Sequence, residues 1–165
     1  MVFLRALVLQ HQNLFDQGIA YIDAASSRGV DDPLKQRESS KCAMLQVLGR
    51  IGEAIDCYES CLDESWNSPG VLNNYGSALL LVNKEEGIGV LGRVLNLVPD
   101  MLQTLVNLAG YYQDEGSMDK TDTMLSRALK AHPSSNVRVR RALITAPTSR
   151  DYVHIVSDRL RMEAR

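Results

Sequence analysis

Histidines and cysteines are the residues of this 165-residue chain best suited to chemistry, and their spacing argues against catalysis. The three histidines, His11, His132 and His154, fall in three different predicted elements. None has an acidic or thiol neighbour at a spacing that would build a metal site or a nucleophile and its base. We therefore expect no catalytic residue.

The cysteines Cys42, Cys57 and Cys61 form an odd set without CxxC spacing, which argues against both a disulfide framework and a zinc site. Cys57 and Cys61 lie one helical turn apart, as metal ligands sometimes do. Cys42 and Cys61, however, occupy positions where the chain repeats small residues, so buried packing is the favoured interpretation. We expect no metal, no cofactor and a reducing compartment, the cytoplasm or nucleus.

A glycine-rich run, GIGVLG at 87–92, superficially resembles a phosphate-binding loop. It follows no predicted strand, opens no helix and lacks the Lys-Ser/Thr pair, so neither a Walker nor a dinucleotide motif is present. Gly87 instead predicts a close approach between helices.

Composition is ordinary for a soluble globular protein, with 45% hydrophobic residues, 23% charged residues and a net charge of −2. The segment 136–165 holds seven Arg against three acidic residues, but only Tyr152 could stack on a base, so we expect no nucleic-acid binding.

No apolar run approaches the roughly 20 residues that span a bilayer, so we expect no membrane association. Arg5 interrupts the apolar start, and no small-residue cleavage pattern follows, which favours a packed helix over a secretory signal.

Hydrophobic periodicity predicts pairs of helices separated by turns. The expected pairs are 2–12 with 15–26, 34–48 with 51–64, 71–82 with 85–97, and a last pair between Leu102 and Pro133 that Gly116 divides. Small residues recur in the first helices at Cys42, Gly76 and Ala109, spaced by 34 and 33 residues. Those of the second helices, at 54, 87 and 121, are spaced by 33 and 34. Such a shared period indicates stacked repeats.

The motifs NNYGSALL…P at 73–99 and NLAGYY…G…RAL…P at 107–133 resemble the tetratricopeptide repeat (TPR) family. The resemblance covers about residues 1–135 and implies an all-α fold, a right-handed superhelical solenoid of about 3.5–4 TPR-like helical hairpins. The third pair departs from the family pattern, with Asn83 in place of the turn Gly and Gly92 where a bulkier residue is usual. These departures predict a locally looser pair within the same fold.

In that register the first helices line a concave groove for an extended peptide or partner protein, and the lining is neutral and rich in amides. The expected groove residues are Gln36, Ser39, Gln46, Asn73, Asn74, Ser77, Gln103, Asn107 and Gln113. Asn74 and Asn107, 33 residues apart, resemble the asparagine ladder of TPR-containing O-GlcNAc transferases, although Ser40 interrupts it. The alternative is that Asn is simply a common residue at this repeat position. No Lys or Arg lies at the positions with which another TPR subclass clamps a C-terminal carboxylate.

After Pro133 the period ends. Residues 136–145, NVRVRRALIT, predict a short strand, and Ser149 can cap a C-terminal helix from Arg150 towards Arg165. A single strand leaves its backbone groups unpaired, so we expect self-association through Val137–Ile144 or completion by further chain. This second region, 136–165, weakly resembles the junction that follows the repeats in O-GlcNAc-transferase-like (SPINDLY-like) glycosyltransferases. The alternative function is therefore the substrate-selecting part of such an enzyme, without its catalytic domain.

Overall fold

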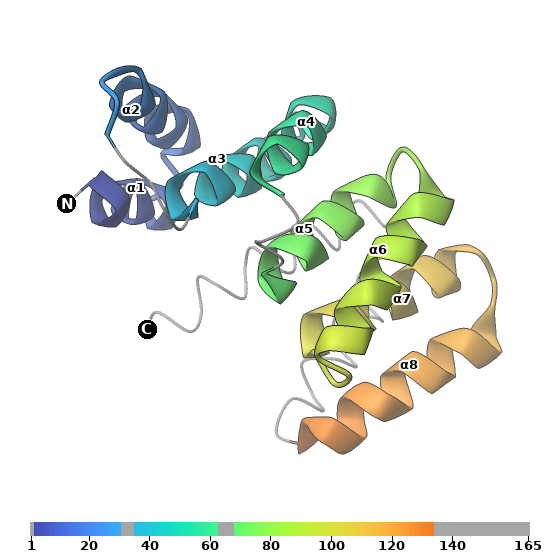
Figure 1. The fold of residues 1–165 in the computed structure, drawn as a ribbon. Coiled ribbons are helices and arrows are strands. Elements are labelled where there is room, and N and C mark those ends of the chain that lie inside the picture. Colours follow the sequence, from blue (N-terminus) through green and yellow to red (C-terminus); the bar gives the residue numbers. More distant parts are fainter. Residues whose placement is uncertain (1, 31–34, 63–67, 134–165) are drawn as a thin grey trace. The chain divides into compact units, whose positions relative to one another are not determined.

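A computed structural model describes residues 2–30, 35–62 and 68–133, and every regular element in these ranges is a helix (Figure 1). The chain divides between Val71 and Leu72 into two compact units. Unit 1 contains four helices, which are α1 (Val2–His11), α2 (Phe15–Ser27), α3 (Gln36–Val47) and α4 (Ile51–Cys61). Unit 2 contains nearly all of α5 (Pro69–Leu79), then α6 (Lys84–Leu97), α7 (Leu102–Asp114) and α8 (Met118–Ala131). The all-α prediction is confirmed for the described ranges.

In unit 1 each helix packs on the next, and α1 also contacts α3. The turn between α3 and α4 is short because Gly49 adopts a left-handed conformation (φ 75°), which costs glycine nothing. The Gly49 N–H then donates to the Gln46 carbonyl at 3.0 Å. Ile22, Met44 and Tyr58 are fully buried and fill the interior of the unit.

In unit 2 the backbones of α5 and α6 approach each other closely at Gly76 and Gly87. A Cβ on Gly87 would lie 2.7 Å from the Leu80 nitrogen and 3.0 Å from the Gly76 carbonyl oxygen. A Cβ on Gly76 would lie 2.8 Å from the Leu91 side chain. The expectation that Gly87 permits close helix approach is thus confirmed.

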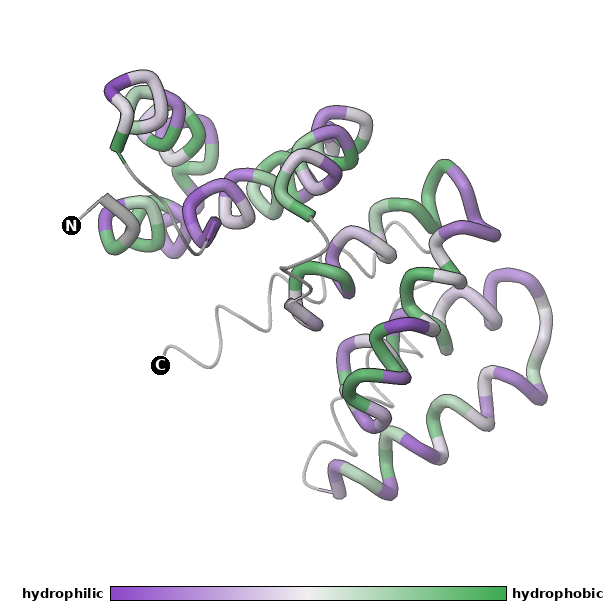
Figure 2. The backbone as a smooth tube through the Cα atoms, in the orientation of Figure 1, coloured by the Kyte–Doolittle hydropathy of each residue, from purple (hydrophilic) through white to green (hydrophobic). Residues whose placement is uncertain are grey.

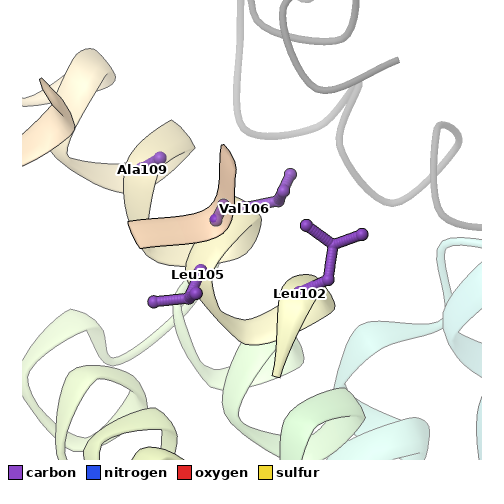
Figure 3. Packing of buried hydrophobic residues seen from close by; sticks show 5 residues of the cluster. Leu102, Leu105, Val106 and Ala109 are labelled. Carbon is purple, nitrogen blue, oxygen red and sulfur yellow. The ribbon is translucent and has the colours of Figure 1, made fainter. Parts of the chain in front are cut away.

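The pair α7–α8 has a buried apolar core. Leu102, Leu105, Val106 and Ala109 of α7 pack with Ala128 of α8 (Figure 3). Gly116, again with positive φ (71°), forms the turn between the two helices. Figure 2 shows hydrophilic residues gathered at this turn and alternating hydropathy along α8, as expected for a helix with one buried face.

The sequence predicts each of the helices in the described ranges, but several of these helices begin or end at other residues than expected. Helix α5 begins at Pro69 rather than residue 71, because proline fits the first position of a helix. It ends at Leu79, whose carbonyl accepts from the Asn83 N–H at 2.7 Å as the chain turns towards α6. Helix α4 ends at Cys61, before the predicted residue 64.

The predicted strand at 136–145 and the helix from Arg150 lie outside the described residues. The same holds for the proposed self-association through Val137–Ile144. None of the helices in the described ranges combines the length and apolar character needed to cross a bilayer.

Two glycines of α6 provide a matched test of this packing. Gly87→Ala should destabilise the protein by about 1–3 kcal/mol, because its Cβ would collide with backbone atoms. A Cβ on Gly89, which lies on the same helix, would have no atom within 4 Å. Gly89→Ala should therefore raise the free energy of unfolding by about 0.5–1 kcal/mol, because alanine has the higher helix propensity. Urea unfolding followed by circular dichroism measures both, and equal midpoints for the two variants would contradict the close approach.

Candidate functional site

A buried polar network connects the two first helices of unit 2, α5 and α7. The side-chain oxygen Oδ1 of Asn73 accepts hydrogen bonds from the Thr104 hydroxyl at 2.9 Å and from Asn107 Nδ2 at 3.1 Å. Thr104 is fully buried, and Asn73 and Asn107 expose 2% and 7% of their surfaces. Because an unpaired amide is costly in such surroundings, these bonds fix α5 and α7 in register.

The amides of this network form a directed chain that ends at Asn74. Asn107 donates to Asn73, and Asn73 Nδ2 donates in turn to Asn74 Oδ1 at 3.3 Å. Each amide in such a chain polarises the next, which strengthens the donor at its end. Within the described part of the chain, Asn74 Nδ2 has no acceptor, and the residue is half-buried. The network therefore presents an NH₂ donor at the edge of the α5–α7 face.

The other predicted groove residues of unit 2 lie on the same helices and are half-buried. Ser77 donates to the Asn74 carbonyl of its own helix at 2.8 Å. Gln103 lies next to Thr104 at the start of α7, and Gln113 lies near the end of that helix.

In unit 1 the three predicted groove residues, all on α3, have different environments. Gln36 is exposed and accepts, through its main-chain carbonyl, a hydrogen bond from the Ser39 hydroxyl at 3.1 Å. Gln46 is buried, and its side-chain oxygen accepts from the Tyr58 hydroxyl of α4 at 3.0 Å. Gln46 thus contributes to the packing of α3 on α4.

Of the predicted residues, the structure brings Asn73, Asn74 and Asn107 together in one network. Thr104, which also donates to Asn73, was not among the predicted residues. Thr104 could have been predicted from its position one turn before Asn107, since residues three apart lie on the same face of a helix.

The three cysteines also come together, in the hairpin of α3 and α4. Their sulfur atoms all lie within 4.8 Å of one another. Cys42 of α3 is joined to Cys57 of α4 by a disulfide with a Cα–Cα distance of 5.4 Å, within the usual range. The buried thiol of Cys61 lies 3.7 Å from the Cys42 sulfur.

The sequence-based argument against a disulfide was therefore wrong for Cys42 and Cys57. That argument used spacing along the chain, whereas the bond joins two antiparallel helices. The small-residue positions of a first and a second helix face each other, so Cys42 and Cys61 meet, and Cys57 lies one turn from Cys61. The positions of the three cysteines within the helical repeat, and not a CxxC pattern, could have predicted that they lie close together.

Exposed charges connect neighbouring helices of unit 2. The Lys84 ammonium at the start of α6 forms an ion pair with Glu115, which follows α7, and lies 5.9 Å from the centre of the Tyr111 ring. The hydrogen bond from Lys84 to Glu115 raises the pKa of Lys84. Because the pair is exposed, its contribution to stability is small.

The two histidines of the described ranges belong to different units. His132 Nε2 lies 2.7 Å from the Asp100 carbonyl oxygen, and His11 ends α1 in the other unit. His154 lies outside the described residues.

A scan against protein-family models and a search of curated proteins both return no match for this chain.

The buried network predicts a large effect for Asn73→Ala. This substitution removes the acceptor of both Thr104 and Asn107, so we expect a loss of about 1–3 kcal/mol in unfolding free energy. Asn96→Ala, which removes an exposed amide from α6, should change stability by no more than about 0.5 kcal/mol. If chemical denaturation gives the same midpoint for both variants, the network does not stabilise unit 2.

The disulfide predicts a dependence of stability on redox state. Its two cysteines are 15 residues apart, and closing a loop of this size lowers the entropy of the unfolded chain enough to stabilise by about 3 kcal/mol. Reductant should therefore lower the unfolding free energy of the wild-type protein but leave unchanged a Cys57→Ser, Cys61→Ala double variant, which retains a single thiol. Three titratable thiols in the unreduced, denatured protein would show that the bond does not form.

Proposed function

We propose that this protein is a non-enzymatic interaction scaffold, and that α5 and α7 of unit 2 bind an extended peptide or a segment of a partner protein. The observation that supports the proposal most directly is the directed amide chain ending at Asn74. Its half-buried NH₂ group can donate to a main-chain carbonyl of a ligand, independently of the ligand's side chains.

The chemistry of this face favours a peptide backbone over a carboxylate. Its polar residues are amides and hydroxyls, including Asn74, Ser77, Gln103 and Asn107, and none of these carries a positive charge. Neutral donors suit a carbonyl, whereas a carboxylate taken from water needs a cation.

The repeated helical hairpins give this proposal its wider context. We infer from the shared 33- to 34-residue period that the hairpins are TPR-type repeats, each presenting its first helix to a ligand. In this interpretation the exposed Gln36 and half-buried Ser39 of α3 offer a similar polar face in unit 1.

The test begins with a displayed library of random linear peptides, selected on the full-length protein. Asn74→Asp keeps the oxygen that accepts from Asn73 but replaces the NH₂ donor with a carboxylate oxygen. It should weaken the selected peptides by about 5-fold to 100-fold in calorimetry, because a carbonyl would lose its donor.

Asn96→Asp makes the same change of charge at an exposed site on α6, and it should leave affinity unchanged. Circular dichroism checks that both variants keep their helicity. Equal affinity of the wild-type and Asn74→Asp proteins would contradict binding at this face.

A further inference from the structure

The three cysteines of the α3–α4 hairpin have no counterparts in the last hairpin, although packing is similar there. A uniform shift of 67 residues places Ala109, Met124 and Ala128 at the positions of Cys42, Cys57 and Cys61. Ala109 and Ala128 are fully buried, as Cys42 is. Small side chains are thus sufficient for the close contact of the helices, and packing does not account for three thiols in one place.

We propose that the reduced protein binds one thiophilic divalent d¹⁰ cation, such as Zn²⁺, through the sulfurs of Cys42, Cys57 and Cys61. Thiolates prefer such soft cations over Mg²⁺ or Ca²⁺. Zinc–sulfur bonds of about 2.3 Å place tetrahedral sulfur ligands about 3.8 Å apart. The 3.7 Å between the Cys42 and Cys61 sulfurs already matches this separation.

The third ligand, Cys57, can complete the site with little change of backbone. It lies one helical turn before Cys61 and is half-buried, so its reduced side chain has room to rotate about its Cα–Cβ bond. All three sulfurs are already within 4.8 Å of one another. A water molecule on the half-buried side of Cys57 would supply the fourth ligand, as it does in zinc sites with three protein ligands.

Charges around the sulfurs favour a divalent cation. Three thiolates and one divalent cation carry a net charge of −1, whereas a monovalent cation would leave −2 in a largely buried site. The Lys35 ammonium brings a positive charge to the Cys61 end of α4, where Nζ donates to the Cys61 main-chain carbonyl at 3.0 Å.

Metal binding and the disulfide exclude each other, because the bond between Cys42 and Cys57 uses two of the three ligands. A reductant must first supply two electrons, and with two protons this cleaves the bond and releases two thiols. A dithiol is left as a disulfide, and a phosphine, which takes oxygen from water, is left as a phosphine oxide. The three thiols then release three protons when they bind the divalent cation as thiolates. The site is therefore occupied only under reducing conditions.

Titration of the full-length protein with Cd²⁺ tests the proposal. The protein is reduced with a phosphine, freed of it without air and titrated while the ultraviolet sulfur-to-cadmium charge-transfer absorption is recorded. We expect saturation at one equivalent, displacement of previously bound Zn²⁺ by Cd²⁺, and no such absorption with the oxidised protein. Reduced wild-type protein without this absorption would overturn the proposal.

Cys61→Ala is the decisive variant, because it removes one ligand but keeps both partners of the disulfide. Removing a residue that only hydrogen-bonds to a metal ligand often lowers metal affinity by about 10–100-fold. Removing a ligand itself should therefore lower the affinity for Cd²⁺ by at least about 100-fold. Ser60→Ala, on the exposed side of the same helix, should bind as the wild type does.

Folding of the variants is checked independently. Alanine already occupies the position equivalent to Cys61 in the last hairpin, at Ala128, so Cys61→Ala should keep its helical circular dichroism. A folded Cys61→Ala protein that binds Cd²⁺ as tightly as the wild type would overturn the three-sulfur site. Cys57→Ala, altered at a half-buried position, provides a second variant with the same expected loss.

Discussion

Close contact between two helices at small side chains is the constraint on which each hairpin depends. At Gly87 a methyl group would collide with backbone atoms, and at Gly76 it would collide with the Leu91 side chain. Ala109 and Ala128 have no exposed surface where α7 meets α8. Bringing the backbones together lets large neighbouring side chains such as Leu105 interdigitate without voids, and dense packing of this kind contributes much of the stability of a helical pair.

This packing also determines where polar groups must pair. The first helix of each pair has one face against its partner, so a polar residue beside that face is partly withdrawn from water. In unit 2 the cost is offset because Asn73 accepts from both Thr104 and Asn107. At Asn74, where this network reaches a half-buried position, the network ends in an amide donor that is left for another molecule.

The sequence was sufficient to predict the helices of the described ranges and the glycine turns at Gly49 and Gly116, because both depend on local periodicity and backbone conformation. It was less informative about side chains that face another helix. Asn74, Asn107 and Gln46 were all expected to line the groove. The Asn107 side chain instead donates to Asn73, and Gln46 accepts from Tyr58. Such contacts depend on distances between helices, which the order of residues does not specify.

The cysteines show the same limit and explain it physically. The separations of 15 and 4 residues match no motif, yet the register that places small residues opposite each other also places Cys42 against Cys61. A third thiol one turn away, at Cys57, then completes a triangle. Because a disulfide and a bound cation would compete for the same sulfurs, redox conditions can alter unit 1 through its own packing contact. The corresponding residues of the last hairpin, Ala109, Met124 and Ala128, form no disulfide, so its packing has no such dependence.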